Sequence, residues 1–297
     1  MRYKVDHSAE GKAFDIIGMS YIGIPRSNTA MFITKKVEHL LPALENVDEC
    51  LVFAETGISV PQELNVKHAF QFCDKPQLAY ARFAEQFAEA RFSEEKKLEF
   101  RLASGGYYVS EDVTIPKDAY IEPGCVIGPD VQIGKNAKIL AGVIIRRSII
   151  GDRVIVNEHA VVGSNGFTMT EDDNGNKIRI PTLGRVVIGN QVEIGACNNI
   201  SCGSGGDTVI EDNVKLDALI HIGHDVHLYK NVEVTAGVTF GGFVEAGEGV
   251  YIGVGSVLRN RIKLGEHSFI GMGANVTKSV EANRVVAGNP AKPFTKR

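Results

Sequence analysis

Tryptophan is absent from this 297-residue chain, and other class-defining features are missing as well. Its five cysteines form no CxxC pair, so neither a disulfide framework nor a structural zinc site is expected. The formal net charge is -4 and no basic block occurs, which argues against nucleic acid as a partner. The apolar runs are shorter than the roughly 18 to 20 residues of a membrane span, and Met1 leads into no signal region. We therefore expect a cytoplasmic protein with reduced thiols and no membrane span.

What the chain does contain is glycine, 32 residues without low complexity, and an internal repeat. An aliphatic residue returns every six positions from Ile115 to Ile145, resumes at Ile150 after a slip of one residue, and returns at Ile188 after a polar stretch. After a second break at 204–206 the series continues from Ile210 to Ala282. A period of six fits no helix. It fits short strands joined by tight turns, which bury their apolar faces by stacking into a solenoid.

The repeated pattern [LIV]-G-x-x-[AVS]-x, over residues 111–288, resembles that of the hexapeptide-repeat acyltransferases. The resemblance implies a mainly β fold, a left-handed parallel β-helix with about 18 residues per coil. It also implies a homotrimer with active sites between subunits. The alternative is a structural solenoid without catalysis.

Residues 1–105 lack the period of six, and their apolar runs at 50–54 and 69–72 predict a small sheet. A helix is expected to begin near Asp74, with Phe83 and Phe87 on one face. The sequence therefore predicts three regions. They are a small α/β domain at 1–105, a β-helix at 106–288 and a short C-terminal tail at 289–297.

Three segments, at 73–82, 162–189 and 207–224, resemble the UDP-3-O-acylglucosamine N-acyltransferases of lipid A synthesis, which acylate the 2-amine of a UDP-sugar. The resemblance implies that the α/β domain binds the nucleotide sugar and the β-helix carries the acyltransferase site. The substrate-binding residues that it suggests are Phe32, Lys35, Lys36, Asn165 and Phe167. Core packing for Phe32 and plain solvation for the two lysines are the alternatives.

Acyl transfer to an amine needs a base and a donor for the oxyanion, and three of the eight histidines cluster at 221, 224 and 227. His224 aligns with the catalytic histidine of the lipid A enzymes, and Ile222-Gly223-His224-Asp225-Val226 also resembles the site of sialic acid and bacillosamine-type acetyltransferases. Either Asp217 or Asp225 could orient its ring. Gly242, one coil later, is a candidate oxyanion or pantetheine contact. Zinc at the histidines is not expected, because this spacing spreads their side chains over different faces.

The chain also departs from the lipid A pattern. Arg261 replaces the second histidine of the family, Ala218 replaces an asparagine, Ser201-Cys202-Gly203 replaces D-R-G, and Asn165 replaces the loop aspartate. The ending at 285–293 resembles CoA-dependent acetyltransferases, without the helical extension that docks acyl carrier protein. We therefore expect no permanently bound cofactor and a short-chain coenzyme A thioester as co-substrate. Arg259, Arg261 and Lys278 are candidates for contacts with the phosphates of coenzyme A, or are ordinary solvated charges.

Together these residues predict an N-acyltransferase that moves an acyl group from acyl-CoA to an amine on a UDP- or dTDP-linked amino sugar. One alternative is a lipid A N-acyltransferase fed by acyl carrier protein. The other is a trimeric nucleotide-sugar-binding scaffold without turnover.

Overall fold

The computed structural model describes residues 1–7 and 12–293, which form two compact units. The first unit comprises Met1–Glu95, Phe167–Leu183 and Ser204–Gly206. The second comprises Lys96–Gly166, Gly184–Gly203 and the chain from Asp207 onward. The first unit therefore draws on two short segments that lie within the hexapeptide region of the sequence.

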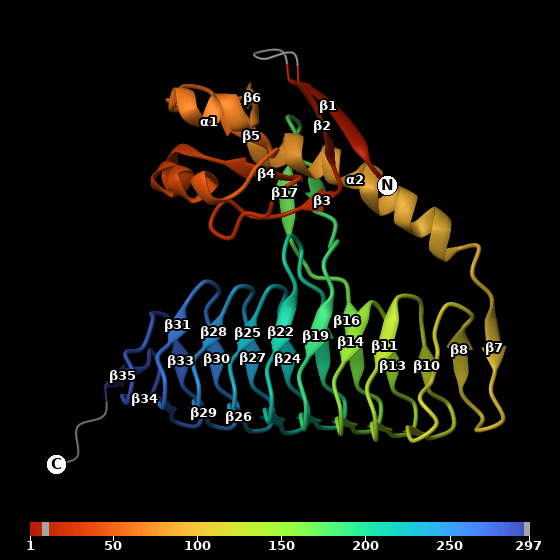
Figure 1. Ribbon diagram of the computed structural model, residues 1–297. Helices are drawn as coiled ribbons and strands as arrows, with labels where there is room; N and C mark the ends of the chain where they lie inside the picture. The colour runs from red at the N-terminus through yellow and green to blue at the C-terminus, as the bar shows by residue number, and fades with distance from the viewer. Residues whose placement is uncertain (8–11, 294–297) are drawn as a thin grey trace. The chain divides into compact units, whose positions relative to one another are not determined.

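A parallel four-stranded sheet, in the order β3-β4-β5-β6, forms the centre of the first unit (Figure 1). The strands are β3 (Gly18–Met19), β4 (Thr29–Ile33), β5 (Leu51–Glu55) and β6 (Ala69–Cys73), and the helices are the 3₁₀ segment η1 (Lys35–Asn46), α1 (Gln62–Lys67) and α2 (Pro76–Glu95). Side chains alternate across a strand, so Leu51 and Phe53 pack with α2 while Val52 joins a second core with η1 and α1. Helices thus cover both faces of the sheet, which explains its near-continuous apolar strands.

The expected helix is confirmed as α2, which begins at Pro76 and buries Phe83 and Phe87. Two antiparallel hairpins complete the first unit. They are β1 (Tyr3–His7) with β2 (Lys12–Ile16), and β17 (Met169–Glu171) with β18 (Lys177–Arg179). Ile180, just beyond β18, is buried in the same core as α2, so the second hairpin is packed into this unit.

The second unit is the expected left-handed parallel β-helix, built from three sheets whose strands stack in successive coils (Figure 1). Sheet 1 contains β7 (Phe100–Leu102), β8 (Tyr108–Ser110), β10 (Val126–Ile127), β13 (Ile144–Ile145), β16 (Val161–Ser164), β21 (Asn199–Ser201), β24 (His221–Ile222), β27 (Thr239–Phe240), β30 (Val257–Leu258) and β33 (Asn275–Val276). Sheet 2 contains β11 (Val131–Ile133), β14 (Ser148–Ile150), β19 (Val186–Ile188), β22 (Thr208–Ile210), β25 (His227–Leu228), β28 (Glu245–Ala246) and β31 (Lys263–Leu264). Sheet 3 contains β9 (Tyr120–Ile121), β12 (Lys138–Ile139), β15 (Ile155–Val156), β20 (Glu193–Ile194), β23 (Lys215–Leu216), β26 (Glu233–Val234), β29 (Tyr251–Ile252), β32 (Phe269–Ile270), β34 (Val285–Ala287) and β35 (Lys292–Pro293). At the two ends of this unit, β7 pairs with β8 and β35 pairs with β34 in antiparallel fashion.

The six-residue period sets the register of these sheets. Ile222 pairs with Phe240, and Phe240 pairs with Leu258, so equivalent residues are 240 − 222 = 18 positions apart. These residues are buried in one continuous core, as the repeat predicts. The prediction for the last position of the series, Ala282, is wrong. Ala282 is exposed, and Val286 takes the buried place in the final coil because the regular stacking ends there.

The chain turns between sheets at three corners, which we name by the sheets that they join. Many corner residues have positive φ, a conformation that suits glycine and asparagine best. Corner 3–1 uses Gly124, Gly142, His159, Cys197, Leu219, Gly237, Gly255 and Gly273. Corner 2–3 uses Asn136, Arg153, Gln191, Asn213, Asn231, Gly249 and His267. Corner 1–2 uses Asp130, Arg147, Asp225, Phe243 and Arg261, none of which is glycine or asparagine. Gly163, with φ of 89°, lies at the bulged end of β16, just before the same corner.

Both interruptions of the repeat fall at corner 1–2. Residues 165–185 separate β16 of sheet 1 from β19 of sheet 2, and residues 202–207 separate β21 from β22. The coils on either side keep their register, because Ile150 pairs with Ile188 and Ile188 pairs with Ile210. The solenoid core is therefore continuous across both breaks.

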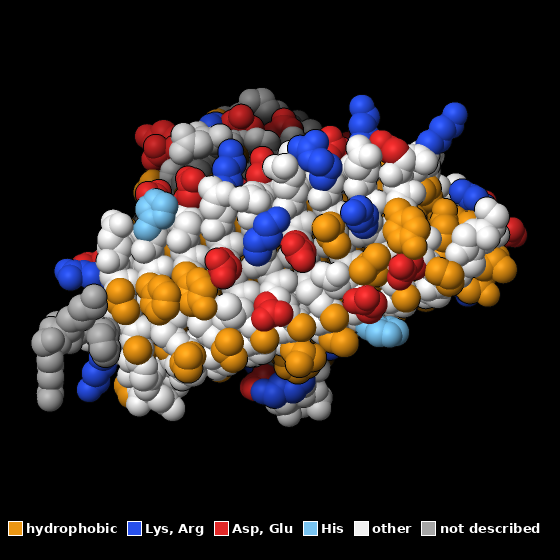
Figure 2. All heavy atoms as spheres, turned by 90° about the horizontal axis from the view of Figure 1, so that it is seen from below, with side chains coloured by type: hydrophobic (Ala, Val, Ile, Leu, Met, Phe, Trp, Pro, Cys, Tyr) orange, Lys and Arg blue, Asp and Glu red, His pale blue; other side chains and the backbone are white. Residues whose placement is uncertain are grey.

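Charges of both signs are interspersed on the face that Figure 2 shows, together with groups of hydrophobic side chains. Tyr251 and Phe269, at outward positions of sheet 3 in successive coils, stack with ring centroids 4.7 Å apart. In the described part of the chain, no helix has the length and apolarity needed to cross a bilayer.

Candidate functional site

His224 and Asp225 form a hydrogen-bonded pair at corner 1–2, in the turn between β24 and β25. Nδ1 of His224 lies 2.7 Å from Oδ2 of Asp225, and the side chains are 14% and 5% exposed. A carboxylate can only accept a hydrogen bond, so this contact places the proton of a neutral imidazole on Nδ1. Nε2 then carries the lone pair that a general base needs.

The backbone holds Asp225 in the orientation that makes this contact. Its φ of 59° lies in the left-handed region, and its N–H donates to Oγ1 of the buried Thr208 at 2.9 Å. Thr208 directly follows the second interruption of the repeat. Its role was not apparent from the sequence, because it depends on the pairing of adjacent coils.

Gly242 lies one coil further on, directly against the ring of His224. A Cβ added at Gly242 would stand 2.6 Å from both Nε2 and Cε1 of His224. Any side chain there would displace the ring, so glycine is required for the close approach. Gly242, expected near His224 because it follows by one coil of 18 residues, therefore lies next to the imidazole.

The other two histidines of the cluster differ from His224. The pKa of His221 lies below its ordinary value, because burial disfavours the imidazolium and His224 repels it. Nε2 of His227 lies 2.8 Å from Oε1 of Glu211, and its ring stacks on Tyr229 at 4.0 Å. No group of three or more His, Cys, Asp and Glu side chains within residues 1–7 and 12–293 is arranged to hold a metal ion.

Asp217, the other candidate acid, is placed differently. It is exposed at the end of β23, and its Oδ1 accepts a hydrogen bond from the N–H of Ala218 at 2.7 Å. The geometry therefore assigns the contact with His224 to Asp225.

Phe243 and Arg261, also at corner 1–2, form a series of contacts that begins at the ring of His224. The ring of Phe243 meets that of His224 edge to face, with centroids 5.2 Å apart and planes at 89°. The guanidinium of Arg261 lies 4.0 Å from the centroid of Phe243. Phe243 was not predicted as a site residue, although the spacing 225, 243, 261 repeats the coil length of 18.

The remaining candidates for contacts with the phosphates of coenzyme A are exposed. Arg259 and Lys278 both face solvent, and NH1 of Arg259 is 3.5 Å from the carbonyl of Thr277. The structure thus places Arg261 against an aromatic ring and leaves the other two candidates on the surface.

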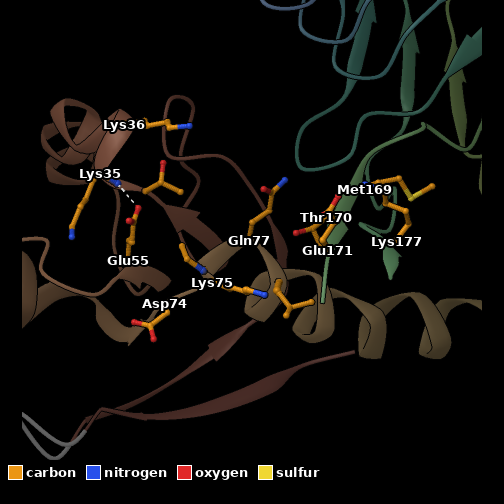
Figure 3. A pocket seen from close by; sticks show the side chains of 13 residues that line it. Lys35, Lys36, Glu55, Asp74, Lys75, Gln77, Met169, Thr170, Glu171 and Lys177 are labelled. Atoms are coloured by element: carbon orange, nitrogen blue, oxygen red, sulfur yellow. Dashed lines mark hydrogen bonds and ion pairs between the residues drawn. The ribbon is translucent and has the colours of Figure 1, made fainter. Parts of the chain in front are cut away.

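A cavity of about 720 Å³ in the first unit contains the two lysines predicted from the sequence (Figure 3). Lys35 and Lys36 line it together with Lys75 and Lys177, which no sequence motif marks as site residues. Lys75 pairs with Asp173 at 2.8 Å, and Lys177 pairs with Glu171. The walls come from η1, α2 and the β17–β18 hairpin, so the 165–185 interruption supplies part of this cavity.

The other substrate-binding candidates do not line this cavity. Phe32 is half-buried, and its ring lies 5.2 Å from that of Tyr80. Asn165 accepts a hydrogen bond from NH2 of Arg147 at 2.8 Å. Phe167 is exposed, with the guanidinium of Arg179 5.3 Å from its ring centroid.

The fold is a parallel β-helix of hexapeptide repeats, and comparison with known proteins confirms the resemblance to the hexapeptide-repeat acyltransferases. A 79-residue segment is 47% identical to UDP-3-O-acylglucosamine N-acyltransferase of Coxiella burnetii (strain Dugway 5J108-111). That segment covers 27% of this chain and 23% of the relative. A segment of equal length is 51% identical to the enzyme of the same name from Herminiimonas arsenicoxydans, covering 27% and 22%.

The structural comparison agrees with the sequence comparison. UDP-N-acetylglucosamine acyltransferase from Campylobacter jejuni superposes with a TM-score of 0.58 at 26% identity, over 64% of this chain and 73% of that one. Residues 109–204 match the family described as GMPPB C-terminal domain. The chain thus matches less than a quarter of the length of the curated relatives named above.

Proposed function

We propose that this protein is an N-acyltransferase that transfers an acyl group from a thioester to the amine of a nucleotide-linked amino sugar. The observation that carries the proposal is the pairing of His224 with Asp225, with Gly242 against Nε2. The names of its relatives support an acceptor derived from UDP-glucosamine.

In the proposed reaction Nε2 of His224 removes a proton from the sugar amine as the nitrogen attacks the thioester carbonyl. Asp225 holds the ring and stabilises the imidazolium that forms. The tetrahedral intermediate then collapses, the C–S bond breaks, and the thiolate leaves and takes up a proton. The products are an amide and a free thiol, and backbone N–H groups at this corner, including that of Gly242, stabilise the oxyanion.

Lys35 and Lys36 supply positive charge for a nucleotide diphosphate, whereas Lys75 and Lys177 already pair with acids. Phe32, Asn165 and Phe167 contribute to acceptor recognition. We propose acyl-CoA as the donor, with Arg259 and Lys278 near its phosphates, and a homotrimer as the assembly. The relatives named UDP-3-O-acylglucosamine N-acyltransferase favour the alternative acceptor, a UDP-3-O-acylglucosamine. In that alternative we expect the donor to be a long acyl chain on acyl carrier protein.

The test is an acyl-transfer assay on the full chain with UDP- and dTDP-amino sugars, using acetyl-CoA or long-chain acyl carrier protein as donor. The product is followed by mass spectrometry. Replacing His224 with Ala is expected to lower kcat by about 10²- to 10⁴-fold while the oligomer stays folded. Near wild-type turnover would refute the assignment of the base. Binding of nucleotide sugars, seen as a rise in Tm, without transfer from either donor would indicate a scaffold instead.

A further inference from the structure

We infer that Phe243 and Arg261 are positioning residues that hold the imidazole of His224 for acyl transfer. The inference rests on the proposed function for its kinetic readout, and on geometry for its argument. Asp225, Phe243 and Arg261 occupy the same place in three successive coils, because 243 − 225 and 261 − 243 are both 18.

The first argument concerns the backbone. Phe243 and Arg261 both have φ of 62°, a left-handed conformation that large L-residues adopt at a cost that glycine and asparagine avoid. The other two corners mostly use glycine or asparagine at such positions. Residues kept in an unfavourable conformation cluster where their side chains have a function. At corner 1–2 we therefore infer that the side chains contribute more than the backbone conformation costs.

The second argument concerns what these side chains contact. The edge-to-face contact of Phe243 with His224 restricts rotation of the imidazole. Arg261 covers the face of Phe243 and fixes that ring in turn, through a cation–π interaction. The backbone repeats this order, since the N–H of Phe243 donates to the carbonyl of His224 and that of Arg261 to the carbonyl of Gly242, both at 3.0 Å.

The remaining corner 1–2 residues with positive φ also use their side chains. Asp130 forms an ion pair with Arg185 at 2.9 Å. Arg147 donates to the carbonyl of Gly163 at 3.3 Å and to Asn165. The left-handed positions of this corner thus share a pattern in which the side chain fixes a neighbouring group.

The test uses Phe243→Asn and Arg261→Asn, because asparagine tolerates the positive φ at both positions. Matched controls make the same changes at other corners, where Leu219 and Arg153 also have positive φ, 61° and 55°. We expect kcat to fall about tenfold in each corner 1–2 variant, with KM for both substrates little changed and Tm equal or higher. The control variants should keep the wild-type kcat. Phe243→Tyr should keep it as well, because it retains the aromatic ring that Phe243→Asn removes. An unchanged kcat, equal losses in the controls, or a change confined to KM for the donor would overturn the inference.

A second measurement separates this inference from the proposed function. The two ring ¹⁵N resonances of His224 report its tautomer, which should be a single species with the proton on Nδ1 in the wild type. Phe243→Asn should add a second ring environment, whereas Leu219→Asn should not. If no donor and acceptor pair reacts, the proposed function fails, but these spectra still decide whether Phe243 positions the ring. Identical spectra in all variants would refute it.

Discussion

Nδ1 of His224 and Oδ2 of Asp225 lie 2.7 Å apart, although the two residues are adjacent in the chain. The left-handed turn at Asp225 allows this contact, because it directs the carboxylate toward the preceding ring. The sequence left the choice between Asp217 and Asp225 open, and the structure separates the two acids clearly.

Asp225→Asn is therefore expected to lower kcat by about 10²- to 10⁴-fold, because an amide no longer enforces the tautomer with the lone pair on Nε2. Asparagine tolerates positive φ, so the change should leave the fold intact. Steady-state kinetics and a thermal melt measure the two effects. Asp217→Asn is the matched control, and a larger loss of kcat in that variant would reverse the assignment of the two acids.

Gly242→Ala tests the packing against the imidazole. The added methyl group would stand 2.6 Å from two ring atoms of His224, so the ring must move. A displacement of this kind is expected to reduce kcat by about 100-fold. At Gly23 the nearest atom to an added Cβ is 3.8 Å away, so Gly23→Ala should behave as the wild type. Equal activity of the two variants would show that the ring is not held against Gly242.

The titration of His221 should respond to His224. Repulsion by His224 is the second cause of the lowered pKa of His221, after burial, so His224→Gln should raise that pKa toward its ordinary value. An NMR titration of the two proteins measures the change. A pKa of His221 that does not move would show that the two rings are not electrostatically coupled.

The same residue affects stability as the pH changes. Since the pKa of His221 is lower in the folded state, the unfolded chain binds the proton more tightly. Stability is therefore lost as the pH falls through the unfolded value of about 6.5, and the loss ends below the folded pKa. His221→Gln should lose less Tm than the wild type between about pH 8 and pH 5. Parallel curves for the two proteins would contradict this.

Cys50 and Cys197 should differ in reactivity toward an alkylating reagent. Burial raises the pKa of the Cys50 thiol to about 11, so at pH 8 only about one molecule in a thousand carries the thiolate. Cys197 is exposed at corner 3–1. Peptide mapping after brief alkylation should find the label on Cys197 first and on Cys50 only after denaturation. Rapid labelling of Cys50 in the native protein would show that its site opens readily.

The sequence predicts the β-helix well because each coil repeats one simple requirement, a buried side chain every six residues. Ile222, Phe240 and Leu258 satisfy it in register, and the phase of the repeat follows directly. Ala282 satisfies the spacing but not the packing, since no regular coil follows to cover it.

The site was predictable only in part. His224 and Gly242 follow from a resemblance and from coil arithmetic. The stacking of Arg261 on Phe243 depends on the left-handed backbone at both residues, which is unusual for arginine and phenylalanine. Lys75 and Lys177 are 102 positions apart, and no periodicity indicates that they line one cavity.

The excursion at 165–185 leaves the solenoid and returns without disturbing the pairing of Ile150 with Ile188. Lengthening such a loop costs little closure entropy, about 0.6 kcal/mol for each doubling. Evolution can therefore lengthen or shorten the turn between β17 and β18 at little cost, provided that Ile180 keeps its place in the core of the first unit. The coil that carries His224 stays the same through each such change.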